Sequence, residues 1–390
     1  MRRLDGAGPG AKAPAWPAPG AGIVINPVLT DMAVYPFTRL EEERRRLLAE
    51  GVEVIDFGKG DPNEPTDPMI RQALVDALPE RAPYPLAQGL PELRGAAANW
   101  LERRFGVAVD PEREIVPTYG SKEAIFSLAQ VLGTDDRVIA FGEPAYPVYE
   151  RGALFAGARV RTLPLRRENG FLPDLGELDY DVALVWVNYP HNPTGAVAPR
   201  EFYDELAEAA ERHDFVVGSD EAYTELWFDE PPPSALQAAD RSRLVVFQTL
   251  SKRSSMTGYR SGFVAGPAEI VAALKAYRPT VGTAPQEFVQ RASVVAWNDE
   301  RHVEETRARY RAKRDVLIPA IESHGWEIVA SEATMYLWTI GPDPAALLER
   351  GIIVSPGEMF GPSGEGYVRF ALVPTLEECE RAAEILREVA

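Results

Sequence analysis

Short apolar runs alternate with amphipathic helical stretches from about residue 110 onward, and this alternation limits the possible folds more than any other feature. The runs cover 138–141, 182–187, 215–218, 244–247 and 262–265. Each run has the length of one buried strand, and the stretches between them have helical periodicity, as in 199–213. This pattern is the signature of βαβ units. We therefore predict an α/β fold with a mostly parallel sheet.

The pattern changes near residue 285, which we predict as a domain boundary. A long charged helical stretch, 286–321, precedes strand-like segments at 326–329, 335–339, 352–355 and 367–371 and a closing helix at 376–389. We predict a large domain over 60–285 and a smaller α+β domain over 286–390. Residues 23–59, with a helix over 38–50, are predicted to form an N-terminal arm and part of the small domain. Residues 1–22 are rich in Ala, Gly and Pro, which predicts a disordered tail.

The composition argues against several classes of protein. Asp and Glu number 59 against 41 Lys and Arg, a net charge of −18 that opposes binding to nucleic acid or an acidic membrane. No apolar run approaches the roughly 20 residues that span a bilayer, and no export signal is recognisable. Cys379 has no second cysteine to pair with, and the four histidines lack metal-binding spacing. We expect a cytoplasmic protein without a metal, and nucleotide-binding, zinc-protease and serine-hydrolase motifs are absent.

Polar residues follow three of the predicted strands. The runs lead into Asn188-Tyr-Pro-His-Asn-Pro-Thr-Gly195, Ser219-Asp-Glu-Ala-Tyr223 and Gln248-Thr-Leu-Ser-Lys-Arg253. Because ligands of open parallel sheets bind beyond the carboxyl ends of the strands, these segments should meet at one rim. We predict that the rim contains Asn192, Asp220, Tyr223 and Lys252.

A fourth segment has the pattern of an anion site. The strand-like run 115–118 is followed by Tyr119-Gly-Ser-Lys-Glu123 and an amphipathic helix. A small-residue turn at a helix N-terminus offers free N–H groups and the positive end of the helix dipole to an anion. Arg260, with the hydroxyls of Thr249 and Ser251, could bind the same anion. The simpler alternative is an ordinary N-cap at Ser121.

These residue types together suit pyridoxal 5′-phosphate (PLP). A desolvated lysine near a cation loses its proton readily and can form a Schiff base with an aldehyde, so Lys252 is the candidate. PLP also needs an acid that keeps its ring nitrogen protonated, for which Asp220 is suited. Asn192 and Tyr223 are donors for the ring phenolate. Tyr146 could cover the ring face, although it could equally be a turn-packing tyrosine.

The sequence resembles the fold-type I PLP-dependent aminotransferases of class I/II, the aspartate aminotransferase superfamily. The resemblance covers residues 24–390. The matching motifs are Asn192-Pro-Thr-Gly195, Asp220-Glu-Ala-Tyr223, Ser251-Lys252 with Met256-Thr-Gly-Tyr-Arg-Ser-Gly262, and Tyr84-Pro-Leu-Ala-Gln-Gly-Leu-Pro-Glu-Leu-Arg94. The resemblance implies the PLP-dependent transferase fold type I, with a seven-stranded sheet in the large domain.

The resemblance also implies a role for each candidate residue. Lys252 would be the Schiff-base lysine and proton carrier, Asp220 would pair with the ring nitrogen, and Tyr223 and Asn192 would bind the phenolate. The expected phosphate-binding set is Gly120, Ser121, Lys122, Thr249, Ser251 and Arg260, with Tyr146 stacked on the ring. Tyr84 would reach the phosphate of a neighbouring subunit, which implies a homodimer with shared sites. Arg369 would bind the substrate α-carboxylate beside Gly60, with Asn192 close by.

Within this family the likeness is greatest to N-succinyldiaminopimelate aminotransferases. It rests on Leu250-Ser-Lys-Arg-Ser254, Arg260-Ser-Gly-Phe-Val-Ala-Gly266, Ala296-Trp-Asn-Asp-Glu300 followed by His302-Val303, and Tyr336-Leu-Trp338. The segment 297–300 could instead be only a helix terminus. The likeness implies glutamate as amino donor and N-succinyl-2-amino-6-ketopimelate as acceptor, in lysine and diaminopimelate biosynthesis. Arg253, Arg278 and Lys59 are candidates for binding the distal carboxylate, with a structural or solvated charge as the alternative for each.

Other functions remain open at this point. An aminotransferase for aspartate, alanine or aromatic amino acids would use the same cofactor residues. A PLP-dependent lyase or decarboxylase on this fold is less well supported. A non-catalytic PLP-sensing domain of a transcription regulator needs an N-terminal helix-turn-helix, which the Pro- and Gly-rich first 22 residues do not suit.

Overall fold

The computed structural model describes residues 25–31, 37–132 and 136–388. Contacts between Cα atoms divide the chain into two units, Met1–Val54 and Ile55–Ala390. The first unit contains α1 (Pro27–Asp31) and α2 (Phe37–Ala49), and α2 matches the helix predicted over 38–50. The predicted tail over 1–22 lies outside the described residues. The second unit includes both sides of residue 285, so the boundary predicted there, like the arm over 23–59, stays a prediction.

Seven strands form the main sheet, in the order β2-β8-β7-β6-β5-β3-β4. Their bounds are β2 (Ile115–Thr118), β3 (Val138–Glu143), β4 (Arg159–Pro164), β5 (Val182–Asn188), β6 (Val216–Asp220), β7 (Leu244–Thr249) and β8 (Gly262–Ala265). All neighbouring strands run parallel except β8, which is antiparallel to β2 and β7. The mostly parallel α/β sheet is confirmed.

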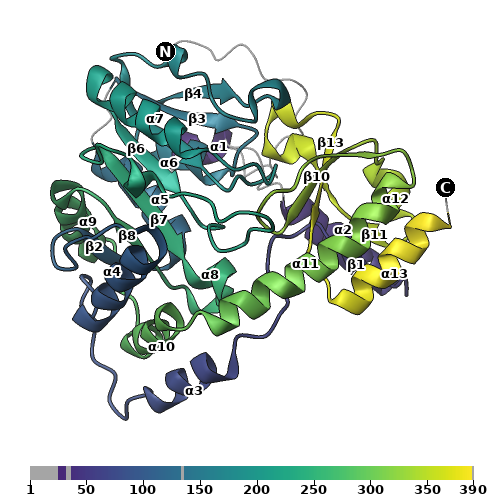
Figure 1. The fold of residues 1–390 in the computed structure, drawn as a ribbon, viewed down its shortest axis with the longest axis horizontal. Coiled ribbons are helices and arrows are strands. Elements are labelled where there is room, and N and C mark those ends of the chain that lie inside the picture. Colours follow the sequence, from purple (N-terminus) through teal and green to yellow (C-terminus); the bar gives the residue numbers. More distant parts are fainter. Residues whose placement is uncertain (1–24, 32–36, 133–135, 389–390) are drawn as a thin grey trace. The chain divides into compact units, whose positions relative to one another are not determined.

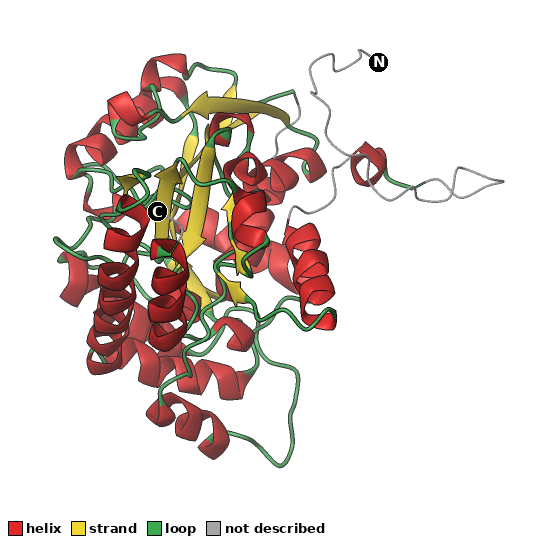
Figure 2. Ribbon diagram, turned by 90° about the vertical axis from the view of Figure 1, so that its right-hand side faces the viewer, coloured by secondary structure: helices red, strands yellow, loops and turns green. Residues whose placement is uncertain are grey.

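Helices cover both faces of this sheet. Successive residues of a strand pack on opposite faces, because their side chains alternate in direction. Val185 and Val187 of β5 belong to the hydrophobic cluster of α4 (Pro91–Phe105), α7 (Arg200–His213) and α10 (Glu287–Asn298). Leu184 and Trp186 belong to the cluster of α5 (Gly120–Val131), α6 (Val148–Phe155) and α9 (Ala268–Thr280). Figure 1 shows the labelled helices, and Figure 2 shows the strands enclosed between helices.

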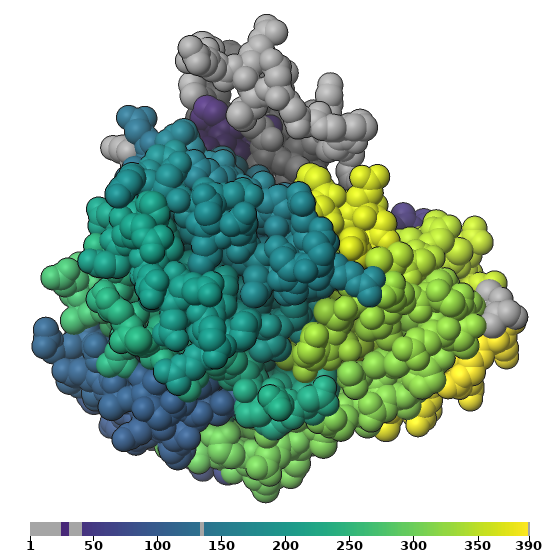
Figure 3. Space-filling model, turned by 45° about the horizontal axis from the view of Figure 1, so that its top comes forward, coloured from purple at the N-terminus to yellow at the C-terminus, as the bar shows by residue number. Residues whose placement is uncertain are grey.

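A smaller antiparallel sheet follows in the sequence, in the order β12-β13-β10-β9. Its strands are β9 (Glu327–Ala330), β10 (Tyr336–Ile340), β12 (Ser355–Pro356) and β13 (Tyr367–Ala371). It shares a hydrophobic cluster with α11 (Arg301–Glu322), α12 (Pro344–Leu348) and α13 (Leu376–Arg387). Figure 3 shows this C-terminal part, coloured green to yellow, packed directly against the teal central part of the chain.

Two predicted elements are wrong in detail. The strand predicted over 352–355 is two short strands in different sheets, because β11 (Ile352–Ile353) pairs with β1 (Ile55–Asp56) and β12 pairs with β13. The helix predicted over 286–321 is two helices, α10 and α11, interrupted at Asp299 and Glu300. The Asp299 carboxylate accepts the backbone N–H of His302 at 3.0 Å, which caps the start of α11. The alternative reading of 297–300 as a helix terminus is therefore confirmed.

The sequence pattern missed β4 and α3 (Pro68–Asp76). β4 lies at the edge of the main sheet and is largely solvent-accessible, so it lacks an apolar run. Its Arg161 instead forms an ion pair of 2.9 Å with Asp181. Within the described ranges, no helix is both long and apolar enough to cross a membrane.

The close packing at Gly218 leads to a testable prediction. Gly218 of β6 lies opposite Trp186 of β5, and a Cβ atom at this position would overlap the Trp186 ring. Gly218→Ala should lower the free energy of unfolding by about 1–3 kcal/mol, because a packed interior cannot absorb the added methyl group. Urea unfolding monitored by circular dichroism measures the change.

The matched control is Gly95→Ala. Gly95 lies inside α4, and a Cβ atom there meets no other atom within 4 Å. Alanine should therefore be neutral or should stabilise the helix by up to about 1 kcal/mol. Equal destabilisation by the two substitutions would contradict the packing argument.

Candidate active site

The main sheet brings three polar segments to one edge. β5, β6 and β7 are adjacent and parallel, and they end at Asn188, Asp220 and Thr249. Asn188 and Asp220 are paired across the sheet, and the Asn188 side-chain amide donates to the Asp220 carbonyl at 2.7 Å. The ends of these strands thus lie together, as the sequence pattern predicted.

Lys252 lies in α8 (Leu250–Arg253), the short helix directly after β7. Thr249 begins this helix by accepting the Ser251 backbone N–H at 3.1 Å. The Lys252 amine is partly buried and donates to the carbonyl of Gly60. Burial lowers the pKa of Lys252 to about 8, Asp61 opposes this shift, and the charges of Arg369 and Arg260 add to it. Lys252 is therefore a lysine whose neutral form is accessible near physiological pH.

Asp220 is 4% exposed at the end of β6. Burial raises the pKa of this carboxyl to about 6, while hydrogen bonds from the Tyr149 hydroxyl and the Ala222 backbone and the charge of Lys252 oppose the rise. The Tyr149 hydroxyl donates to Asp220 Oδ2 at 2.8 Å. Asp220 is thus a buried carboxyl group that accepts a hydrogen bond from the Tyr149 hydroxyl.

Arg369 of β13 is buried and reaches the polar cluster from the smaller sheet. Its guanidinium donates to Asn192 Oδ1 at 2.8 Å and to the carbonyl of Gly58 at 2.9 Å. The guanidinium also lies 4.2 Å from the centre of the Tyr336 ring. The Tyr336 hydroxyl in turn lies 2.8 Å from the hydroxyl of Tyr223. The structure thus joins Arg369, Asn192 and Tyr223 in one network.

Gly60 lies directly against Tyr336. A Cβ atom at Gly60 would overlap the Tyr336 hydroxyl, so a larger residue would displace the ring. Because the carbonyl of Gly60 also accepts from Lys252, this glycine sits between the lysine and the arginine network.

Gly120 and Arg260, two of the residues predicted to bind an anion, meet at the start of α5. Gly120 has a φ of +70°, and a Cβ atom there would lie 3.0 Å from a terminal nitrogen of Arg260. Arg260 donates to the carbonyls of Tyr119 and Thr257 at 2.9 and 3.0 Å and remains exposed. The Thr249 hydroxyl donates to the Ser251 hydroxyl at 2.9 Å. The structure thus brings Gly120 against Arg260, and the binding of an anion by this set stays a prediction.

The surroundings of three predicted phosphate-binding residues, Lys122, Ser121 and Tyr84, give no test of that role in the single chain. Lys122 is exposed, and its amine lies 5.6 Å from the centre of the Tyr146 ring. Ser121 is partly buried beside it on α5. Tyr84 is 100% exposed between α3 and α4. Their roles stay predictions.

Sequence reasoning missed Tyr149, Tyr336, Asn188 and the Gly58–Ser355 pair. Tyr149 stacks on Trp186 with ring centres 5.4 Å apart, and it lies three residues after Tyr146 in the sequence. No sequence motif pointed to Tyr149. Tyr336 was noted for its family likeness, but no pattern linked it to Gly60 or Tyr223. Ser355 and Gly58 lie far apart in sequence, and the Ser355 hydroxyl donates to the Gly58 carbonyl at 2.6 Å.

The altered titration of Lys252 leads to a prediction about stability. An unfolded lysine titrates near pH 10.4, so between about pH 8 and 10.4 the unfolded chain holds more protons than the folded chain. Below pH 8 the amine is charged in both states, and the folded state bears the whole cost of burying it. Lys252→Met should therefore stabilise the ligand-free protein at neutral pH, by about 1–3 kcal/mol.

The gain in stability of Lys252→Met should shrink as the pH rises from about 8 to 10.4, and it should be absent above this interval. Unfolding by urea at several pH values measures it. Lys122→Met, at an exposed position of α5, is the matched control and should show no pH-dependent gain. A Lys252→Met protein that is less stable than the wild type at neutral pH would contradict the assignment.

Comparison with known proteins identifies the family. Residues 52–386 match the family "Aminotransferase class I and II". A relative from Aquifex aeolicus (strain VF5), an LL-diaminopimelate aminotransferase, is 40% identical over 374 residues, which cover 91% of this chain and 96% of the relative.

Two solved structures from Thermus thermophilus share the fold. A single mutant of its aspartate aminotransferase has a TM-score of 0.88 and 28% identity, over 95% of this chain and 100% of that chain. A probable N-succinyldiaminopimelate aminotransferase has a TM-score of 0.83 and 31% identity, over 91% of this chain and 100% of that chain. The chain therefore belongs to the class I and II aminotransferases, the PLP-dependent transaminases of fold type I.

Proposed function

We propose that this aminotransferase moves the amino group of glutamate to the keto group of N-succinyl-2-amino-6-ketopimelate, in lysine and diaminopimelate biosynthesis. One observation supports the general reaction. Arg369, whose side chain suits a carboxylate, lies in the same network as Lys252 and Gly60. The acceptor is supported by the sequence stretches shared with N-succinyldiaminopimelate aminotransferases and by the solved structure of that description.

The residues present fit PLP. PLP supplies an aldehyde for an amine and a ring that accepts electrons when its nitrogen is protonated. Lys252 offers an amine whose pKa is lowered to about 8, and Asp220 offers a buried carboxyl at the end of the adjacent strand. Gly120, at the start of α5, leaves room beside Arg260 that a side chain would fill. The chemistry of this donor set matches an aldehyde, a basic ring nitrogen and a phosphate.

We assign the catalytic roles as follows. Lys252 would hold the cofactor through its amine and would take up and return the proton of the substrate carbon. Asp220 would keep the ring nitrogen protonated, and Tyr149 restrains the carboxyl by its 2.8 Å hydrogen bond. Tyr223 and Asn192 would donate to the ring oxygen, and Tyr146 would cover the ring face. These assignments rest on the residue types, on their common location and on the family motifs.

We assign the binding roles in the same way. The phosphate is held by Gly120, Ser121, Lys122, Thr249, Ser251 and Arg260. Arg369 binds the α-carboxylate of each amino acid and keto acid in bidentate geometry, with Gly60 and Asn192 beside it. Ser355 and Phe360 hold Arg369 in place, because the Arg369 guanidinium lies 3.4 Å from the Ser355 hydroxyl and 4.6 Å from the centre of the Phe360 ring.

We also propose a homodimer in which Tyr84 binds the phosphate of the partner subunit. Tyr84 is fully exposed, and Leu86, Val75, Leu78 and Val281 are exposed apolar side chains of the same unit. Large apolar side chains that are exposed in one chain can be buried against a second chain. A second copy of this chain would cover them and would bring Tyr84 to a second site.

Two of the sequence candidates for the distal carboxylate are held inside the chain. Arg253 is 2% exposed and pairs with Glu300 at 2.8 Å, and Arg278 is fully buried and pairs with Glu123 at 3.1 Å. These contacts support the structural alternative for both arginines. Lys59 remains the candidate for the succinyl carboxylate, and it is only partly buried.

A second candidate substrate is the unacylated diaminopimelate. It is favoured by the relatives named LL-diaminopimelate aminotransferase, which include the protein from Aquifex aeolicus and one from Trichormus variabilis that is 38% identical. We place either reaction in the cytoplasm, which is supported by the buried free thiol of Cys379.

The role of Asp220 gives the third prediction. Asp220→Ala should bind some PLP but should lose turnover by orders of magnitude, because the ring nitrogen loses its charge partner, a loss on the order of several kcal/mol. Single-turnover kinetics with glutamate measure the effect. The control is Glu221→Gln, which alters the next buried carboxyl, one that hydrogen-bonds to Gln248 at 2.8 Å instead of facing the site. It should retain most turnover, and near-wild-type turnover in Asp220→Ala would contradict the role.

The acceptor gives the fourth prediction. With glutamate as donor, kcat/KM should be highest for N-succinyl-2-amino-6-ketopimelate among a panel that includes oxaloacetate, pyruvate and phenylpyruvate. The reverse reaction with 2-oxoglutarate should prefer N-succinyl-LL-diaminopimelate to LL-diaminopimelate. A tenfold preference for the unacylated compound, about 1.4 kcal/mol, would favour the second candidate. A similar preference for oxaloacetate or pyruvate would contradict both.

A further inference from the structure

The residues directly after Lys252 are bound to the turn between α10 and α11. The Ser254 hydroxyl lies 2.8 Å from His302 Nε2, and His302 Nδ1 lies 2.6 Å from Asp299 Oδ2. Ser254 and His302 are 2% and 3% exposed, so the chain of hydrogen bonds is closed to solvent over most of its length. The two sequence stretches 250–254 and 296–303 that carried the family likeness therefore meet in space.

Arg253 binds the same turn. Its guanidinium donates to the carbonyl of Ala296 at 2.7 Å and to the Glu300 carboxylate at 2.8 Å. It also lies 5.0 Å from the centre of the Trp297 ring. Both residues that follow Lys252 thus have their side chains bound at the junction of α10 and α11.

The hydrogen bonds define the protonation state and the tautomer of His302. Burial lowers the pKa of His302, the charge of Arg253 adds to this shift, and Asp299 and Asp67 oppose it. Other charged groups at this turn and pocket are Arg71, Arg103, Glu300, Arg301, Glu305 and Arg309. In neutral His302 one ring nitrogen donates to Asp299, which leaves Nε2 to accept from Ser254. Every polar atom of the imidazole is then used.

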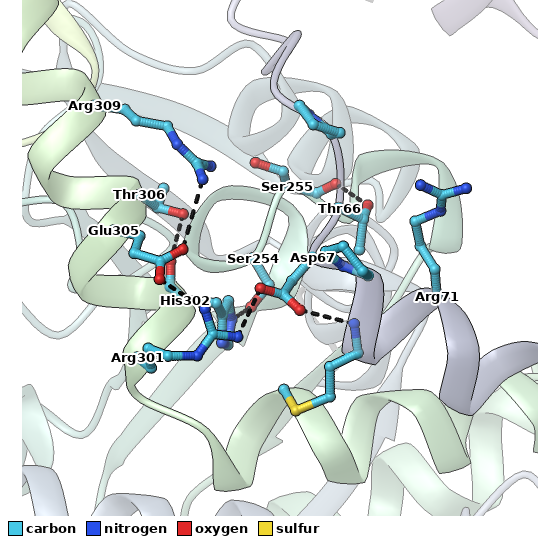
Figure 4. Close-up of a pocket in the computed structure, with 13 residues that line it drawn as sticks. Thr66, Asp67, Arg71, Ser254, Ser255, Arg301, His302, Glu305, Thr306 and Arg309 are labelled. Carbon is cyan, nitrogen blue, oxygen red and sulfur yellow. Dashed lines mark hydrogen bonds and ion pairs between the residues drawn. The ribbon is translucent and has the colours of Figure 1, made fainter.

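A serine, a histidine and a carboxylate in this order also occur in hydrolytic sites. Figure 4 shows Ser254 and His302 at the wall of a pocket of about 440 Å³. The Ser254 hydroxyl is largely enclosed. Of the arginines that line the pocket, Arg301 forms ion pairs of 3.0 and 2.7 Å with Asp67 and Glu305, and Arg309 lies 3.7 Å from Glu305. An acyl-transfer nucleophile needs access to its substrate and donors for the oxyanion. The arrangement therefore favours support of the neighbouring lysine.

We propose that Ser254, His302 and Asp299 are positioning residues for Lys252, which fix the turn after the lysine so that its amine meets the cofactor and the substrate carbon at one angle. This proposal rests on the proposed role of Lys252. A lysine side chain has four flexible carbon–carbon bonds, so its direction depends on a fixed backbone. A misplacement of about 1 Å in an active site can cost up to 100-fold in rate, which makes such a support necessary.

The test compares Ser254→Ala and Ser254→Thr in the PLP-loaded enzyme. Ser254→Ala removes the donor to His302 and should lower kcat by about tenfold with little change in KM, because the lysine and not the carboxylate site is disturbed. Ser254→Thr keeps the hydroxyl and should restore most of the loss. The second measurement is the pH titration of the absorbance band of bound PLP, which should move in Ser254→Ala and return in Ser254→Thr.

The matched control is Thr306→Val. Thr306 is buried on α11 at the same pocket, and its hydroxyl donates to the His302 carbonyl at 2.7 Å. This variant loses one buried hydroxyl but keeps the Ser254–His302 contact, so its kcat and its absorbance titration should match the wild type. Asp299→Asn, which alters the far end of the chain without removing volume, should change both quantities in the same direction as Ser254→Ala.

Three results would overturn the proposal. Wild-type kcat and absorbance titration in both Ser254→Ala and Asp299→Asn would do so. So would equal losses in Ser254→Ala and Ser254→Thr, or equal losses in Ser254→Ala and Thr306→Val, which would indicate a general loss of stability. Failure of the proposed function is recognised separately, since the wild-type protein would then carry PLP on a lysine other than Lys252.

Discussion

Lys252 places an amine in a partly buried position among Arg369, Arg260, Asp220 and Asp61, and the site depends on how these charges balance. Burial and the two arginines favour the neutral amine, whereas the carboxylates favour the charged one. The result is a lysine with a pKa of about 8, which can act as a nucleophile and as a proton carrier. Asp220 shows the complementary effect, because burial raises its pKa to about 6. Both groups thus exchange protons near neutral pH.

The fold supplies this balance by bringing two sheets together. Asp220 ends β6, and Lys252 lies in α8 directly after the adjacent parallel strand β7, whereas Arg369 comes from β13 of the smaller antiparallel sheet. The network of Arg369, Asn192, Tyr336 and Tyr223 joins the two parts through hydrogen bonds and ring contacts. The two residues after Lys252 bind the other way, because Arg253 donates to the Ala296 carbonyl and Ser254 lies within hydrogen-bond distance of His302. Side-chain contacts are therefore present on both sides of Lys252 along the chain.

Six of the seven strands of the main sheet could be predicted from sequence because they form apolar runs, whereas the exposed edge strand β4 could not. The bounds of β2 and β8, and of β13 in the smaller sheet, match the prediction. Motifs that follow a strand directly, such as Asp220 to Tyr223, were located for the same reason. Tyr149, Tyr336 and His302 could not be found in this way. Their partners lie 71, 113 and 48 residues away in the chain, and no local pattern encodes such a contact. The continuous helix predicted over 286–321 overlooked the break at Asp299, which only the alternative interpretation of 297–300 as a helix terminus included, because the break depends on a side-chain cap within a continuous helical composition.

The central claim is that Lys252 is the residue that carries PLP, and the most direct test is chemical. The PLP-loaded protein is reduced with borohydride, digested, and mapped by mass spectrometry. We predict one modified peptide, with the pyridoxyl group on Lys252, and no modified peptide from Lys252→Ala treated in the same way. A pyridoxyl group on another lysine of the wild-type protein, or an unchanged yield of modified peptide from Lys252→Ala, would contradict the account.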